Sequence, residues 1–245
     1  MSKKIIGIDI NEVLRYRWLQ FDRFYVEEFG EEGVPEIPYV YDFWKEYKWE
    51  DKEETTKYLN EDLPDDIRPS DYQVDEKTGE APVDFLAFSA ETKTIPAREL
   101  FKQFMYQDYL FEIHGSAPMM YNGLDQDLEK FYNKFKHQFD FKIVSKENWF
   151  TIPPTLFFLS KCMPRIQKYA LVSTDEEIWK EVDILITTDP ELLLHVPYGK
   201  KVIKVSRPYN EKIKGKSKIE VFQILDLLEN EKFDKEIKFK KLNNK

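Results

Sequence analysis

The sequence contains few of the residues on which several common kinds of site depend. A single cysteine, Cys162, excludes an internal disulfide framework and a cysteine-based zinc site. The three histidines are scattered along the chain, which argues against a histidine-rich metal centre. Eight glycines in 245 residues also make a glycine-rich phosphate loop an improbable element. We therefore expect a protein without disulfides, in a reducing compartment.

Long hydrophobic runs are absent as well. No apolar stretch approaches the ~18 residues that cross a bilayer, and runs such as residues 155–159 have the size of core segments. The first ten residues include two lysines but too short an apolar segment for a signal peptide. We expect a cytoplasmic protein with no membrane partner, or a virion component if a phage encodes it, because the usage of lysine, asparagine and phenylalanine suits an AT-rich bacterial or phage genome.

Charge is unevenly distributed along a chain whose net charge is −9. Residues 41–84 carry fifteen acidic and six basic residues, and residues 200–245 carry fourteen basic and seven acidic residues. Charge runs of this kind are usually solvated faces. A nucleic-acid-binding domain should instead present a dominant basic surface, so we expect no nucleic-acid partner.

The apolar segments predict a parallel α/β fold. Five short runs rich in β-branched residues are typical of buried strands, at residues 4–9, 141–145, 169–173, 183–187 and 201–205. Helical patterns accompany the later strands. One spans residues 122–139, and the others begin at residue 152, at the capping box Thr174–Glu177, at Asp189 and at a second capping box, Ser217–Glu220. Alternating strands and helices predict a parallel sheet with helices on both faces.

About 130 residues separate the first strand from the second, which is more than a crossover needs. We expect residues 15–29 and 97–110 to be helical, residues 31–96 to be irregular and residues 111–120 to be extended. The predicted organisation is a core of residues 1–14 and 121–245, with residues 15–120 as an inserted, acidic and aromatic-rich cap. Such an insertion would cover the carboxyl edge of the sheet, where open α/β proteins bind ligands.

Four segments, in order, resemble the motifs of the haloacid dehalogenase superfamily. They are IIGIDINEVL at residues 5–14, FKIVS at 141–145, VDILITTD at 182–189 and KKVIKVSRPYN at 200–210. The last is similar to the turn of the 5′(3′)-deoxyribonucleotidase branch. The resemblance covers residues 1–14 and roughly 123–210, and it implies a Rossmann-like three-layer core, Mg²⁺ as cofactor and phosphatase chemistry.

The same resemblance assigns degenerate catalytic positions to this chain. Asp9 stands where the family has its nucleophile, and Asn11 replaces the acid that protonates the leaving group, which an amide cannot do. Glu12 replaces a glycine and would repel an anionic substrate. Thr187 and Thr188 replace the paired acids that hold Mg²⁺, so we expect no cofactor unless the protein is active.

The remaining candidates each have a functional and a structural interpretation. Ser145 and Lys161 are the candidates for phosphate binding, although Ser145 could equally cap the next helix. Asp9 and Asp189 are the candidates for holding a metal, although Asp189 is also placed to be the N-cap before a proline. His114 has no second ligand nearby and is expected to be a core or interface histidine.

Three functions stay open from the sequence. The favoured one is a catalytically degenerate protein that acts through a protein partner, as a structural component of a larger phage or bacterial assembly. The second is a Mg²⁺-dependent phosphatase or 5′-nucleotidase with Asp9 as nucleophile. The third is a protein that binds a nucleotide or phospholigand without hydrolysing it. Loss of a general acid costs ~10²–10⁴-fold in rate, which favours the first.

Overall fold

The computed structural model describes residues 3–36, 42–58, 89–162, 166–213, 217, 219–229 and 233. The chain divides into two compact units. The larger unit consists of Met1–Lys48 and Gln103–Lys245, and the smaller one of Trp49–Lys102. Of the predicted cap, residues 15–48 and 103–120 belong to the larger unit and residues 49–102 to the smaller one.

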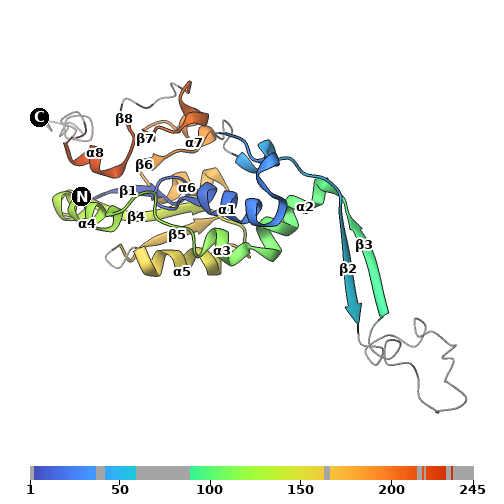
Figure 1. The fold of residues 1–245 in the computed structure, drawn as a ribbon. Coiled ribbons are helices and arrows are strands. Elements are labelled where there is room, and N and C mark those ends of the chain that lie inside the picture. The colour runs from blue at the N-terminus through green and yellow to red at the C-terminus, as the bar shows by residue number, and fades with distance from the viewer. Residues whose placement is uncertain are drawn as a thin grey trace, which may run out of the picture. The chain divides into compact units, whose positions relative to one another are not determined.

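A six-stranded parallel sheet forms the centre of the larger unit (Figure 1). Its strands are β1 (Lys4–Asp9), β4 (Phe139–Lys146), β5 (Tyr169–Val172), β6 (Ile184–Thr187), β7 (Lys201–Val205) and β8 (Glu220–Val221). They lie in the order β5-β4-β1-β6-β7-β8. The order runs outward in both directions from β1, so the topological switch point of the sheet lies between β1 and β6. The predicted parallel α/β fold is confirmed.

Helices cover both faces of this sheet because its strands alternate apolar side chains between the two faces. Ile6 and Ile8 belong to the core beneath α4 (Leu124–Phe135), α5 (Ile152–Cys162) and α8 (Ile224–Glu229). Leu185 and Val202 belong to the opposite core, beneath α6 (Asp175–Glu181) and α7 (Pro190–Leu194). Both faces of each central strand are thus removed from water, which explains their continuous apolar runs.

Gly7 marks a close approach between β1 and the segment that leads into β6. A β-carbon on Gly7 would lie 2.5 Å from Cγ1 of Val182, closer than two carbon atoms can approach without movement. Glycine is required here because of space, since its backbone needs no left-handed conformation.

Between β1 and β4, the larger unit contains α1 (Arg17–Phe29), two 3₁₀ turns (Glu31–Gly33 and Phe43–Glu46), the π-helical turn Phe104–Asp108 and α3 (Leu110–His114). Helix α2 (Ala97–Gln103) precedes the π-helical turn. An aromatic cluster within the larger unit joins α1, the second 3₁₀ turn and the π-helical turn, with Phe21 in edge-to-face contact with Phe43, Tyr47 and Phe104. The predicted extended segment at residues 111–120 is wrong in its first part, because α3 continues to His114.

The smaller unit contains an antiparallel pair of strands, β2 (Lys52–Tyr58) and β3 (Ser89–Ile95), with Lys52 opposite Ile95. The predicted irregular structure for residues 31–96 is therefore wrong for these two segments. Their sequences, KEETTKY and SAETKTI, lack the apolar alternation by which a strand is recognised. Residues 37–41 and 59–88, which the same prediction included, lie outside the described residues.

The second predicted capping box, Ser217–Glu220, is also wrong. Val221 is buried in β8, where it pairs with Val205, and helix α8 begins only at Ile224. The Asp226 carboxylate accepts the backbone N–H groups of residues 222 and 223. Burial of the valine on the sheet outweighed the local capping pattern. No helix in the described part of the chain is long and apolar enough to cross a bilayer.

Candidate functional site

The carboxyl ends of β1, β4 and β6 bring Asp9, Ser145 and Thr187 to one edge of the sheet, as the sequence predicted. Asp9 stands opposite Val144 in the β1–β4 register, and the Thr187 hydroxyl donates to Asp9 Oδ2 at 2.6 Å. Asn11 Nδ2 lies 3.4 Å from Ser145 Oγ. These contacts join positions that are more than 130 residues apart in the sequence.

Asp9 is enclosed, with 3% of its surface exposed. Besides Thr187, it accepts the N–H of Ile10 at 2.7 Å through Oδ1. Burial raises the pKa of Asp9 to about 7, and the hydrogen bond from Thr187 opposes this only in part. A nucleophilic carboxylate has to be ionised, so this environment disfavours the charge state that attack on phosphorus requires.

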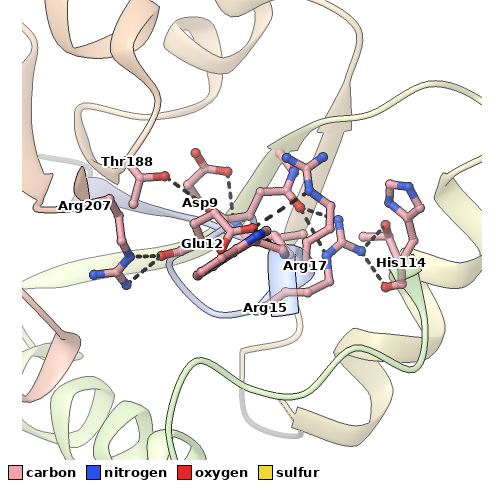
Figure 2. A network of polar contacts seen from close by, with 12 residues as sticks. Asp9, Glu12, Arg15, Arg17, His114, Thr188 and Arg207 are labelled. Carbon is pink, nitrogen blue, oxygen red and sulfur yellow. Dashed lines mark hydrogen bonds and ion pairs between the residues drawn. The ribbon is translucent and has the colours of Figure 1, made fainter. Parts of the chain in front are cut away.

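Asn11 is held by a buried arginine. Arg15 is fully buried, and its guanidinium donates from Nε to Asn11 Oδ1 at 3.1 Å. It also donates to the His114 carbonyl at 2.6 Å and to the Thr155 hydroxyl at 2.9 Å (Figure 2). The guanidinium forms an ion pair with Glu147, with Nη2 3.1 Å from Oε1.

Glu147 completes this buried network. Its Oε1 accepts from the Ser145 hydroxyl at 3.0 Å as well as from Arg15, and its Oε2 accepts from the Thr151 hydroxyl at 2.6 Å. Ser145 therefore donates its proton to an internal carboxylate, and a phosphate could receive that hydrogen bond only if the Ser145–Glu147 contact broke. A buried ion pair with this many hydrogen bonds strongly resists the removal of one partner.

Asp189 is the N-cap of α7, which confirms the structural interpretation of this residue. Its Oδ1 accepts the N–H of Glu191 at 2.8 Å, and a proline follows it at the first helical position. Its Oδ2 lies 3.8 Å from the ammonium of Lys146, which also contacts Asp175 at 2.7 Å. The second carboxylate of the site is thus neutralised by a lysine of the chain itself.

Lys161 lies apart from these groups. It is exposed in the last turn of α5, with its ammonium 4.6 Å from the centre of the Phe157 ring. Of the two residues predicted to bind phosphate, only Ser145 lies at the edge described above. Lys146, which directly follows Ser145, provides the ammonium group of that edge.

His114 is buried in α3, as its interpretation as a core residue predicts. Its ring stacks on Tyr106, with centroids 6.0 Å apart. Burial lowers the pKa of His114 well below its usual value, and the charges of Arg15 and Arg17 act in the same direction. The imidazole is therefore neutral at pH 7.

The donor set at this edge does not fit a magnesium ion. Mg²⁺ prefers octahedral oxygen coordination that includes one or two free carboxylates. Both Asp9 oxygens accept hydrogen bonds, and the Asn11 carbonyl accepts from the Thr188 hydroxyl at 3.2 Å. Asp189 accepts the N–H at the start of α7 and lies next to the Lys146 ammonium. Among the described residues, no group of three acidic, histidine or cysteine side chains could hold a metal.

The sequence reasoning missed Arg15, Lys146 and Glu147. The sequence did contain a signal for these residues, since Arg15 lies four residues after Asn11, and Lys146 and Glu147 directly follow Ser145. Charged residues close to the ends of strands that meet at one edge are expected to interact. An interpretation based on motifs alone gave these residues no role.

Comparisons with known proteins give little further guidance. No family model matches the chain, and no curated protein matches it in sequence. Among solved structures, the chain is similar to a haloacid dehalogenase-like hydrolase from Burkholderia xenovorans LB400. The match has 11% sequence identity and a TM-score of 0.49, and it covers 94% of this chain and 98% of that one. At this level it carries no argument about activity.

Proposed function

We propose that the protein is a degenerate haloacid dehalogenase-like scaffold that acts by binding another protein. The observation that carries this proposal is the closed edge of the sheet. Arg15 and Glu147 form a buried ion pair that engages Asn11 and Ser145, which stand at two of the positions that the resemblance assigns to phosphoryl transfer. Internal side chains thus already use the polar groups of Asn11 and Ser145.

The chemistry of the edge supports the same conclusion. Asp9 has a pKa raised to about 7 by burial, and Asn11 has no acidic proton to deliver. Loss of a general acid alone costs ~10²–10⁴-fold in rate. A Mg²⁺-dependent phosphatase or nucleotidase with Asp9 as nucleophile is the competing function, and non-hydrolytic binding of a phospholigand is another.

An exposed aromatic pair on α3 and α5 is the surface that we propose for the partner. Phe111 and Phe157 are 45% and 42% exposed, and their rings lie 4.8 Å apart. Leu156 beside them is 37% exposed, and Lys161 places its ammonium over the Phe157 ring. Neighbouring apolar side chains on a surface are typical of interaction sites. The lysine favours a partner segment that carries a carboxylate next to apolar side chains.

A pair of matched variants tests this surface. Phe157→Asp places a charge in the aromatic pair, whereas Phe222→Asp changes a ring that is 72% exposed and belongs to a different segment. The wild type and both variants are cross-linked to their neighbours in the cells that produce them, and the attached proteins are identified and quantified by mass spectrometry. We expect one partner whose yield falls at least about tenfold in Phe157→Asp and is unchanged in Phe222→Asp, as for an interface hot spot. Equal yields from both variants would contradict the proposal.

A further inference from the structure

A tight turn between α7 and β7 holds a tyrosine out in solvent. Tyr198 is fully exposed, at 104% of its reference surface. The N–H of Lys200 donates to the Pro197 carbonyl at 3.2 Å and closes the turn. Gly199 has a φ of 80°, which a type II turn requires at its third position. The turn therefore presents the Tyr198 ring from a fixed backbone, and burial within the chain does not explain the residue.

A groove adjoins this turn, between α6 and α7. Its volume is about 470 Å³, and Pro197 and Lys200 of the turn belong to its wall. Trp179 of α6 is the buried member of the lining, with 5% of its surface exposed, so it forms the floor. The other lining residues are polar side chains of the two helices and the segment after α7, namely Asp175, Glu176, Lys180, Glu191 and His195. A projecting aromatic ring and a groove with an aromatic floor thus lie next to each other on one surface.

The groove also carries an acid and a base that the chain leaves unpaired. Glu176 and Lys180 lie four residues apart on α6, which places them on the same side of the helix. Neither makes an ion pair with any residue in the part of the chain that the structure describes. Two such surfaces that meet about a two-fold axis can place the acid of each copy against the base of the other, so the surface is complementary in charge to itself.

We propose that this surface is the contact between two copies of the chain in a two-fold dimer. Tyr198 of each copy enters the groove of the other and packs against Trp179, and Glu176 of each copy faces Lys180 of the other. The occupant is a second copy because the projecting ring, the groove and both charges occur on one surface, as an isologous interface requires. Tyrosine is also among the residues that most often anchor protein interfaces.

The proposal does not depend on the binding of another protein. Residues of α6 and α7 belong to one core of the sheet, and residues of α5 belong to the core on the opposite face. The dimer therefore leaves the Phe111–Phe157 pair accessible. Loss of the dimer and loss of the other partner are distinguishable, because the substitutions that test the dimer leave α3 and α5 unchanged.

Sedimentation velocity tests the projecting ring. Over roughly 1–300 μM, the wild type should shift reversibly from the mass of one chain to the mass of two, as expected for a small interface. Tyr198→Ala should raise the dissociation constant at least about tenfold, because it removes the anchor. Phe222→Ala removes a ring that is 72% exposed on another segment, and it should leave the dissociation constant unchanged.

The paired charges have their own test. Glu176→Lys alone and Lys180→Glu alone should each weaken the dimer about tenfold, because each would then hold two pairs of like charges. An equimolar mixture of the two variants should associate about as well as the wild type, because every pair in the mixed dimer joins opposite charges again. A substitution that merely damaged the fold would not be rescued by mixing.

The proposal is overturned if the wild type keeps the mass of one chain throughout this range, or if Tyr198→Ala associates as the wild type does. It is also overturned if the mixture associates no better than the single variants. Assemblies that continue to grow beyond two chains would contradict the two-fold arrangement.

Discussion

Replacing Asp9 by asparagine removes a buried ionisable group and keeps its shape. Asp9 is 3% exposed, and burial raises its pKa from 3.8 to about 7. In the unfolded chain the carboxyl group ionises near its ordinary pKa. Between these two values the folded protein therefore binds a proton that the unfolded chain has released, and the free energy of unfolding falls as pH rises. This contribution is fully present below about pH 4 and lost above about pH 7.

The size of this pH-dependent contribution to the free energy of unfolding follows from the pKa shift of Asp9. A rise of about three pKa units corresponds to roughly 4 kcal/mol between the two extremes, at about 1.4 kcal/mol per unit. About 2–3 kcal/mol of this falls between pH 5 and pH 8. The substituted asparagine carries no such charge, so the stability of Asp9→Asn relative to the wild type should rise by that amount over this range. Other titrating groups are shared by both proteins and cancel in the difference.

Urea unfolding of the wild type and of Asp9→Asn, measured at pH 5, 6, 7 and 8, provides the test. The slope of the unfolding free energy against urea concentration should be the same for both proteins, which shows that the unfolded states are comparable. A stability difference that stays constant from pH 5 to pH 8 would refute the reasoning, because it would mean that Asp9 is ionised in the folded protein throughout this range.

Further substitutions test the fold and the closed edge. Arg15→Met should destabilise the protein by about 3–5 kcal/mol in urea unfolding, because it leaves Glu147 buried without its partner, and adding Glu147→Gln should recover part of the loss; no recovery would contradict the ion pair. Gly7→Ala should destabilise the protein by about 1–3 kcal/mol in the same assay, because its new methyl group would collide with the Val182 side chain. The same substitution should cost less when it is made in a Val182→Ala protein, where the colliding methyl group is absent. Thr174→Ala should cost about 1 kcal/mol through the loss of the α6 capping box, whereas Thr174→Ser should not.

The parts of the fold that the sequence predicted are those in which local pattern and tertiary burial agree. The run from Ile5 to Ile8 is apolar because both faces of β1 are covered. Thr174 and Asp189 cap helices whose starts their local sequences already mark. The meeting of Asp9 with Thr187 followed from parallel strands ending at one edge. These features need no knowledge of loop conformation.

The parts that the sequence did not predict depend on loops and on distant burial. Arg15 reaches Glu147 because the turn after β1 folds back, with the N–H groups of residues 14 and 15 both bonded to the Ile10 carbonyl. Strands β2 and β3 have polar sequences and are defined by their mutual hydrogen bonds. Val221 joined the sheet against a local helical signal because burial next to β7 was available. Predicting each of these features would have required knowing which residues are neighbours in three dimensions.

The central claim is that this scaffold binds another protein and does not catalyse phosphoryl transfer. It is tested most directly by measuring the hydrolysis of phosphate esters. Hydrolysis of p-nitrophenyl phosphate and of deoxynucleoside monophosphates is measured with Mg²⁺ present, for the wild type and for Asp9→Asn prepared in parallel. With Asp9 enclosed and Asn11 held by Arg15, we expect the two proteins to give the same rate, equal to the buffer background. Hydrolysis by the wild type that requires Mg²⁺ and disappears in Asp9→Asn would contradict the account.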